Sequence, residues 1–358
     1  MMKSPTLKIP VQLLALLFLL LVAVGCSSTV PVDGFEDRGD GTDLRFDLPG
    51  TGNSVGSWED GGGEAPSTTV SPLAEGTRVR ILAFIRAAGG GQPDLSADIP
   101  VGQGVYVAGS DGSLIAEGTG LRLLSGKTYD FYAFTPDLSP SVPGYTLSVD
   151  HGVDFASSLT TAMVTEERRV KLNPLVRRSS KVTVVAAPQA DNVTGFTVSS
   201  LKLKNMTKGP LSVSPSSDFD LSGVLQTGEV TLAGETFSSL SDPQSPLAQS
   251  ASAVILPKTA AKFGIELTVN FANQTSDTRL TAEVGGEAGQ EFKAGYHYRL
   301  NMKLQGGHAE LWLTVVPWDS DVTTVPELGI GTRLDLKIQS WEEVVIDGSN
   351  PDDPGYIG

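Results

Sequence analysis

The feature that most constrains the fold is a series of short runs in which apolar and polar residues alternate. The clearest is "FGIELTVNF" (263–271), where Phe263, Ile265, Leu267, Val269 and Phe271 fall on one face of an extended chain. A period of two is typical of a strand in a sheet that has one buried and one exposed face. The run therefore predicts an antiparallel sheet packed against a hydrophobic core.

Comparable runs recur from residue 77 to residue 305, separated by clusters of Gly, Pro, Asp and Ser, which is the pattern of β-sandwiches and barrels. Helical signals are scarce, and the best of them, "SSLTTAMVTEE" (157–167), is weak. We predict an all-β protein with two tandem β-sandwich domains, residues 72–176 and 177–326. The boundary is placed where Pro174 and the basic pair Arg177 and Arg178 separate two strand-like runs.

The N-terminus has the features of an export signal. A short basic stretch is followed by the apolar run "VQLLALLFLLLVAV" (11–24), and the only cysteine of the chain, Cys26, comes directly after "AVG". The run is shorter than the roughly 20 residues that a membrane-spanning helix needs. The segment resembles a bacterial lipobox, so residues 1–25 are predicted to be a lipoprotein signal peptide and Cys26 to be the lipidated residue. An ordinary cleaved signal beside a chance cysteine is the alternative.

Residues 26–71 are rich in Gly, Ser, Asp and Pro and have few apolar clusters. Such a composition does not bury enough apolar surface to offset the entropy of ordering, so a flexible leader is expected. Within it, "LRFDL" (44–48) alternates and could form one short strand. At the other end, residues 327–358 are predicted to be a C-terminal extension.

Composition and motifs exclude several classes of function. The net charge is −15 and no basic stripe occurs, which argues against nucleic acid as a partner. The three histidines, His151, His297 and His308, are far apart and have neither metal-ligand nor triad spacing. No phosphate-binding loop, nucleophile elbow or dinucleotide fingerprint is present. We therefore expect no enzymatic activity, no metal site and no cofactor.

Several stretches together resemble the fimbrillin family, the lipoprotein pilins of Gram-negative gut and oral anaerobes. They span roughly residues 70–325 and are "VRILAFIR" (79–86), "YDFYAFTP" (129–136), "LNPLVRRSSKVTVV" (172–185), "SAVILPKTAAKFGIELTV" (252–269), "FKAGYHYRLNMKLQ" (292–305) and "LTVVPWDSD" (313–321). The resemblance implies two transthyretin-like sandwiches assembled into surface pili. It also implies outer-membrane delivery by the lipid on Cys26.

In that family a protease cuts after an arginine of the leader, which removes the lipid and the first strand, and a strand from a neighbouring subunit fills the emptied groove. The resemblance points to Arg45 as the cut site, with Arg38 second. Such assembly is β-augmentation, in which a sheet edge supplies main-chain hydrogen bonds and apolar pockets receive alternate side chains. An uncut chain would be an anchor subunit that keeps Cys26.

Two stretches near the C-terminus look like strands that end at a tryptophan and acids, "AELWLTVVPWDSD" (309–321) and "TRLDLKIQSWEEV" (332–344). The first matches the end of the family's second domain. In the second, Leu334, Leu336 and Ile338 alternate with charged residues, which predicts a strand with one apolar face. It is either a donor strand for the next subunit or an edge strand of its own sandwich.

The sequence thus predicts a structural subunit of a surface pilus, exported as a lipoprotein to the cell outer membrane. Its partners would be other pilus subunits, by β-strand addition, and a ligand on a host or bacterial surface, so that it contributes to adhesion. The alternative is a glycan-binding surface lipoprotein, which would need exposed aromatic platforms. Tyr106, Tyr129, Tyr132 and Tyr145 lie in strand-like runs, where packing in the core is the simpler expectation.

Overall fold

A computed structural model describes residues 43–55, 67–316, Trp318 and residues 332–333, with gaps at 88–89, 94, 96–98, 143, 189–192, 222–225, 243–244, 273–276, 286–288 and 306–307. Within these residues the protein is all β, with 24 strands and two 3-10 helices, η1 (Pro215–Ser217) and η2 (Gly234–Thr236). The prediction of an all-β protein is confirmed. No helix among them is long and apolar enough to cross a membrane.

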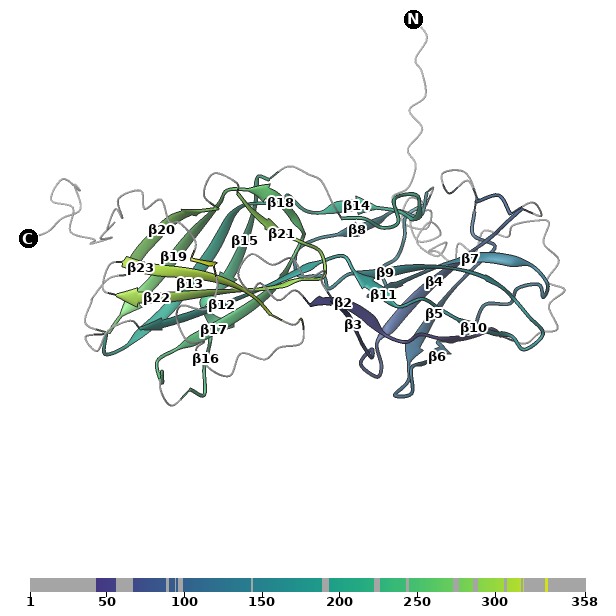
Figure 1. Ribbon diagram of the computed structural model, residues 1–358, viewed down its shortest axis with the longest axis horizontal. Coiled ribbons are helices and arrows are strands. Elements are labelled where there is room, and N and C mark those ends of the chain that lie inside the picture. Colours follow the sequence, from purple (N-terminus) through teal and green to yellow (C-terminus); the bar gives the residue numbers. More distant parts are fainter. Residues whose placement is uncertain are drawn as a thin grey trace, which may run out of the picture. The chain divides into compact units, whose positions relative to one another are not determined.

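The first half of the chain forms one sheet of ten strands (Figure 1). In spatial order these are β10 (Arg169–Lys171), β1 (Arg45–Asp47), β6 (Ser113–Ala116), β5 (Gly102–Ala108), β4 (Arg78–Ile85), β7 (Thr128–Thr135), β9 (Ala156–Met163), β11 (Leu175–Arg177), β2 (Thr51–Val55) and β3 (Ser67–Ser71). The first hydrophobic cluster, whose residues lie between Leu44 and Leu175 in the sequence, packs against this sheet.

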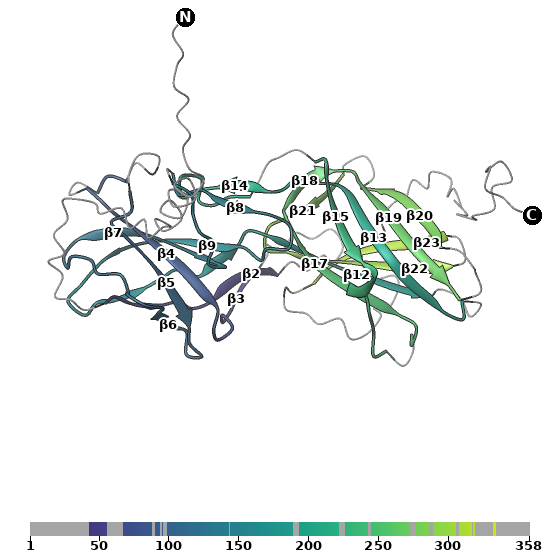
Figure 2. The ribbon, with the colours of Figure 1, turned by 180° about the vertical axis from the view of Figure 1, so that it is seen from behind.

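The second half forms two sheets around a second hydrophobic cluster, of residues between Val182 and Leu313 (Figures 1 and 2). The six-stranded sheet has the order β16 (Ser238–Ser239), β17 (Gln249–Ile255), β12 (Ser180–Pro188), β22 (His297–Gln305), β23 (His308–Val316) and β24 (Thr332–Arg333). The four-stranded sheet has the order β15 (Gly228–Ala233), β13 (Phe196–Met206), β19 (Phe263–Phe271) and β20 (Thr278–Val284).

The alternating run 263–271 is strand β19, and its five apolar residues all lie in the second cluster, as predicted. The weak helical candidate is wrong: residues 156–163 are strand β9, paired with β7 on one side and β11 on the other. Ser and Thr make up half of β9, so its own sequence favours neither structure strongly, and pairing with two neighbours decides the outcome.

Two small sheets complete the fold. β18 (Lys258–Ala261) pairs with β21 (Gln290–Phe292), and β14 (Leu211–Val213) pairs with β8 (Leu147–Val149), so that β14 and β8 run side by side in both ribbon views (Figures 1 and 2). The β8–β14 pair belongs to a third hydrophobic cluster that joins Phe134 and Phe155 of the first half to Phe219 and Leu256 of the second. The chain passes from the ten-stranded to the six-stranded sheet between β11 and β12, and this cluster connects the two halves.

The structure differs from the expected leader in one respect. Residues 45–47, 51–55 and 67–71 are strands of the ten-stranded sheet, although the composition of residues 26–71 predicted an exposed segment. The short strand expected at 44–48 is present, and its apolar face is buried in the first cluster. Three apolar side chains at alternate positions are enough to anchor the segment once a complementary core exists.

Candidate functional site

The predicted strand exchange depends most directly on the first strand, β1. It lies between β6, to which it is antiparallel, and β10, to which it is parallel. Leu44, Phe46 and Leu48 are 2%, 1% and 3% exposed and point into the first cluster. Main-chain hydrogen bonds fix the segment at both ends: the Leu44 N–H donates to the Leu121 carbonyl (2.8 Å) and the Leu48 N–H donates to the Gly112 carbonyl (3.0 Å).

Phe46 is the central anchor of this strand. Its ring meets those of Tyr106 (5.0 Å between centroids, 82° between planes) and Phe131 (5.4 Å, 73°) edge to face, an arrangement favoured by the aromatic quadrupole. The Tyr106 hydroxyl accepts a hydrogen bond from the Leu121 N–H (2.8 Å), and burial raises the pKa of Tyr106 to about 12. Full burial of a Phe side chain contributes roughly 1.5–3 kcal/mol relative to exposure.

Charged side chains hold the outer face of β1. Arg169 of β10 donates two hydrogen bonds to Asp47, one from Nε (2.5 Å) and one from Nη2 (2.8 Å). Arg122 Nε donates to Asp43 Oδ1 (2.9 Å), and this hydrogen bond lowers the pKa of Asp43. Both pairs are at the surface, where such contacts contribute little to stability, so the inward-facing apolar side chains dominate the retention of β1.

The segments 45–52 and 169–176 run parallel without a change of register. Arg45 is opposite Arg169 in β1–β10, and Thr51 is opposite Leu175 in β2–β11, which is the same offset along the chain. Each segment has a proline between its two strands: Pro49 lies between β1 and β2, and Pro174 lies between β10 and β11. Gly50 has φ +130°, and a Cβ there would lie 2.1 Å from the Ser71 carbonyl oxygen, so only glycine fits this corner. No local pattern in the sequence predicts this long-range pairing, and the related "DLPG" and "KLNP" stretches are its only trace.

Arg45, the first predicted cleavage site, lies inside β1. Its N–H donates to the Arg168 carbonyl (2.9 Å), its side chain is exposed, and the next residue, Phe46, is buried. Residues 46–77 contain neither Lys nor Arg, so the first basic residue after Arg45 is Arg78 of β4. A cut after Arg45 therefore leaves Phe46, Leu48 and strands β2 and β3 attached to the folded chain.

The remaining predicted site residues, Cys26, Arg38, Leu334, Leu336 and Ile338, lie outside the described residues. Just before the last three, β24 pairs with β23 at the edge of the six-stranded sheet, with Thr332 opposite Leu313 and Arg333 opposite Trp312. For residues 332–333 the pairing is that of an edge strand of their own sheet.

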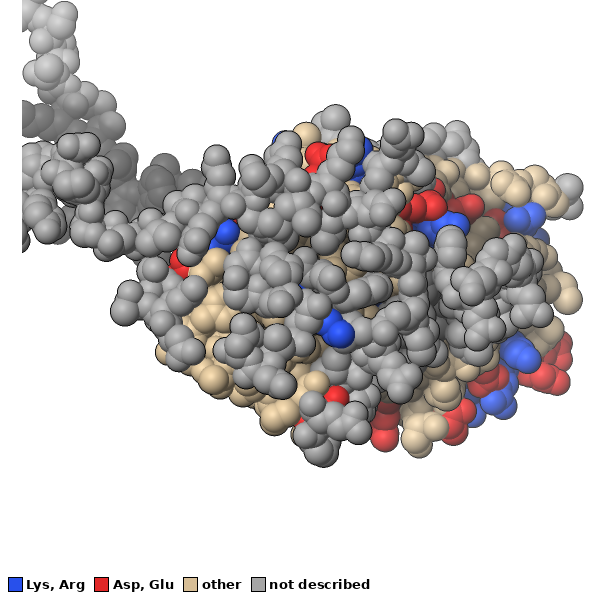
Figure 3. All heavy atoms as spheres, turned by 60° about the vertical axis from the view of Figure 1, so that its left-hand side comes forward, with Lys and Arg blue, Asp and Glu red and all other residues tan. Residues whose placement is uncertain are grey.

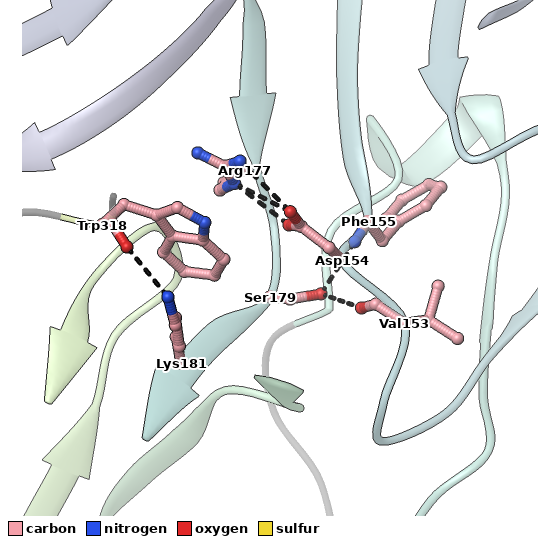
Figure 4. A network of polar contacts seen from close by, with 7 residues as sticks. All are labelled: Val153, Asp154, Phe155, Arg177, Ser179, Lys181 and Trp318. Carbon is pink, nitrogen blue, oxygen red and sulfur yellow. Dashed lines mark hydrogen bonds and ion pairs between the residues drawn. The ribbon is translucent and has the colours of Figure 1, made fainter. Parts of the chain in front are cut away.

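Trp318, in the stretch expected to close the second half, is buried where the two halves of the chain meet (Figure 4). The Arg177 guanidinium lies 4.3 Å from the centre of its ring, and Lys181 Nζ donates to its carbonyl (3.1 Å). Arg177 also binds both carboxylate oxygens of Asp154, with Nε at 3.0 and 3.2 Å. Arg177 of β11 thus takes part in a cation–π contact with Trp318 and an ion pair with Asp154.

His151 and His297 lie in separate hydrogen-bonded contacts. His297 is buried and its Nε2 is 2.7 Å from the Thr183 hydroxyl, while His151 accepts a hydrogen bond at Nδ1 from the Leu256 N–H (3.1 Å). His151 Nε2 is 2.8 Å from the Thr207 carbonyl, so the N–H of the imidazole ring is at Nε2 and donates to this carbonyl. Among the described residues, no three His, Cys, Asp or Glu side chains are placed to hold a metal ion.

The charged and aromatic side chains bear on whether the protein binds nucleic acids or glycans. In Figure 3, Lys and Arg side chains lie beside Asp and Glu on the described part of this face, and they do not form a separate basic patch. Cross-strand ion pairs join Lys202 to Glu229 (3.3 Å) and Lys262 to Glu283 (3.1 Å). Tyr106, Tyr129, Tyr132 and Tyr145 are buried, so these four do not form a platform for glycans.

Comparison with known proteins identifies the family. The fimbrillin-like family profile matches residues 42–322. The fold resembles that of two solved structures, candidate cell adhesion proteins of Bacteroides ovatus (TM-score 0.53, 14% identity) and Bacteroides fragilis (TM-score 0.51, 15% identity), each covering 78% of this chain and 100% of the other. A comparison with curated proteins gave no match. The family consists of structural proteins, so this chain is not an enzyme. The chain belongs to the fimbrillin-like family.

Proposed function

We propose that this protein is a structural subunit of a surface pilus, exported as a lipoprotein on Cys26 and joined to other subunits by β-strand addition. The match to the fimbrillin-like family over residues 42–322 is the observation that carries the proposal. In this role it is anchored at the cell outer membrane or incorporated into the pilus at the cell surface. Contact with a ligand on a host or bacterial surface makes it contribute to adhesion.

The slot of β1 supports assembly by strand addition. It combines main-chain pairing on both sides with three inward-facing apolar side chains, the features by which an added strand is held in strand complementation. The first hydrophobic cluster is therefore completed at this position by a short strand with one apolar face.

Processing at Arg45 or Arg38 would release the lipid without opening this slot. Both residues precede Phe46, and no Lys or Arg follows until Arg78, so the part of β1 that carries Phe46 and Leu48 stays joined to β2. Opening the slot would require β1 to leave β6 and β10 and expose Phe46. In our proposal, loss of the lipid anchor and acceptance of a neighbouring strand are thus separate events.

Leu334, Leu336 and Ile338 would form the apolar face of the donor strand. The alternative, in which residues 334–346 complete the six-stranded sheet, has support from the β23–β24 pairing at residues 332–333. Both arrangements can occur in one pilus if the segment leaves β23 when a neighbouring subunit offers a free edge.

The test compares residues 27–358 with the same protein carrying Leu334→Asp, Leu336→Asp and Ile338→Asp, and with a chain ending at Glu327. Size-exclusion chromatography with light scattering is run over a range of concentrations, before and after treatment with an arginine-specific protease. We expect oligomers from the first protein and monomers from the other two. If all three are monomeric under every condition, assembly by the C-terminal strand is wrong.

The role in pili is tested separately on cells. Antibody labelling in electron microscopy is expected to place the protein on surface filaments, and a Cys26→Ser variant is expected to lose its attachment to the outer membrane. Labelling confined to a smooth cell surface, in a strain that makes pili from other subunits, would contradict the proposed role.

A further inference from the structure

The turn between β8 and β9 contacts two separate segments of the second half of the chain. On one side, the Gly152 N–H donates to the Val254 carbonyl of β17 (2.8 Å). On the other side, Asp150 lies so close to Gly209 that a Cβ at residue 209 would overlap its carboxylate. β8, which precedes the turn, pairs with β14. The turn and the strand before it are therefore both held by the second half.

His151, in this turn, joins the two segments through one imidazole ring. Its Nδ1 accepts a hydrogen bond from the Leu256 N–H (3.1 Å), and its Nε2 donates to the Thr207 carbonyl (2.8 Å). Both partners are main-chain groups of buried residues, Leu256 at 0% and Thr207 at 2% exposed. The ring makes these two hydrogen bonds at once only in its neutral form, with the N–H at Nε2.

Protonation of the ring at Nδ1 would break this arrangement. The imidazolium ion has an N–H at both nitrogens and no acceptor, so the new Nδ1–H and the Leu256 N–H would face each other. The Leu256 N–H would remain buried without a partner, which costs more than an exposed ion pair returns. Relief requires the ring to move away from Leu256, and the Gly152–Val254 hydrogen bond is made by the next residue of the same turn.

The charged groups around the ring do not compensate for this loss. In the same turn, Asp150 is exposed and accepts a hydrogen bond from the main-chain N–H of His151 (2.8 Å), and Asp154 is engaged in an ion pair of its own. Lys208 and Lys258, one from each flanking segment, are positively charged and disfavour a further positive charge nearby.

We infer that His151 is a pH-sensitive latch, which holds the β8–β9 turn against the second half of the chain while its imidazole is neutral and releases it when the ring takes up a proton. The ordinary charge change of histidine lies between pH 8 and pH 5, so the release occurs in this range. The third hydrophobic cluster and the pairing of β8 with β14 rest on apolar and main-chain contacts that do not titrate there, so the junction loosens without unfolding. The inference goes beyond the proposed function, because it concerns a single molecule and does not depend on strand exchange.

Hydrogen–deuterium exchange measured by mass spectrometry tests the latch in residues 27–358. Exchange is followed between pH 5.5 and pH 8 in peptides that cover residues 252–258, which include the Leu256 N–H, and residues 263–271, which form β19. Each rate is divided by the intrinsic rate of an unstructured peptide at the same pH. Protection of residues 252–258 is expected to fall by up to about tenfold for each pH unit below neutrality, the limit set by one proton. That of β19, the reference for unfolding of the second half, should change less.

His151→Gln is the matched variant, because a glutamine amide offers an acceptor and donors but takes up no proton in this range. Its protection of residues 252–258 is expected to be the same at every pH. His308→Gln, in β23 outside the turn, is the control and should keep the pH dependence of the unaltered protein. Gly209→Ala displaces Asp150 by overlap and should lower the protection at every pH.

Nitrogen NMR of the histidine rings gives a second measurement, made on the unaltered protein. The neutral ring of His151 is expected to carry its N–H at Nε2, and its titration should coincide with the loss of protection of residues 252–258. The latch is wrong if the protection does not change with pH, or if His151→Gln shows the same pH dependence as the unaltered protein. Failure of strand exchange would leave these results unchanged, so the two proposals are tested independently.

Discussion

At the scale of single residues, Phe46 is the side chain on which the ordered N-terminal segment most depends. It is 1% exposed and contacts Tyr106 and Phe131, whereas its neighbour Arg45 points outward. Phe46→Ala is expected to lower the free energy of unfolding by about 3–5 kcal/mol, because a large apolar contact is replaced by a cavity. Arg45→Ala should change it by less than about 0.5 kcal/mol. Urea denaturation measures both values, and equal effects would contradict the assigned orientation.

Lys258 predicts a pH dependence. It is 2% exposed, and its ammonium group donates to the carbonyls of Thr259, Ala261 and Gln290. Burial lowers the pKa of Lys258 to about 8, from an ordinary value of 10.5. Between these two values the unfolded chain binds more protons at this residue than the folded chain, so its contribution to the stability of the folded state rises with pH.

The corresponding measurement compares the protein with Lys258→Met at pH 7.5, 8.5 and 9.5. The Met variant is less stable throughout, since three carbonyls lose a donor. The free energy of unfolding of the unaltered protein is expected to rise relative to that of the variant as the pH increases. A difference that is constant with pH would show that Lys258 titrates alike in the folded and unfolded chains.

The side chains that face the core could be predicted from the sequence where apolar and polar residues alternate. The alternating residues of 263–271 and the strand at 44–48 were predicted because a period of two is a local property. The burial of Lys258 was not, because a lysine in "LPKTAAKF" has no local signal that three carbonyls from two strands surround it.

At the scale of elements, β1 is held by neighbours from distant parts of the chain. The Arg45–Phe46 bond lies in a strand paired on both sides, and a protease needs an extended, unpaired substrate. We expect an arginine-specific protease to cut this bond slowly, and Phe46→Ala to accelerate the cut by increasing the population of the opened strand. Mass spectrometry of the time course measures the rate.

The product of that cut is also predictable. The chain beginning at Phe46 is expected to keep its circular dichroism and to remain a folded protein, because Phe46, Leu48, β2 and β3 stay attached. An Ile115→Ala variant, altered at an exposed position, should be cut at the original rate. Unfolding of the product upon cleavage would show that Leu44 and the residues before it are essential to the slot.

At the scale of the whole molecule, Phe219 connects the two halves of the chain. It is 1% exposed and its ring lies 5.2 Å from that of Phe134 and 6.0 Å from that of Phe155. Phe219→Ala removes the centre of the third cluster, at a cost of about 3–5 kcal/mol. We expect the single thermal unfolding transition of the unaltered protein to separate into two, because the halves keep their own clusters but lose the shared one.

Phe271→Ala is the matched control, since Phe271 belongs only to the second cluster. It should lower the stability of the second half without separating the transitions in the same way. Scanning calorimetry distinguishes the two outcomes. A single transition in both variants would mean that the Arg177–Trp318 contact and the other links at the junction are enough to couple the halves.

Local sequence patterns are enough to predict an all-β fold, the longer strands such as β19, the lack of a catalytic or metal-binding motif and the resemblance to the fimbrillins. These depend on composition and on periodicities of a few residues, which any stretch of chain carries locally. Contacts between distant parts of the chain are what place residues 45–47, 51–55 and 67–71 in the first sheet and make β9 a strand. The reason is that strand pairing joins residues such as Arg45 and Arg169, far apart along the chain, and the energy of such contacts depends on a partner that no local pattern specifies.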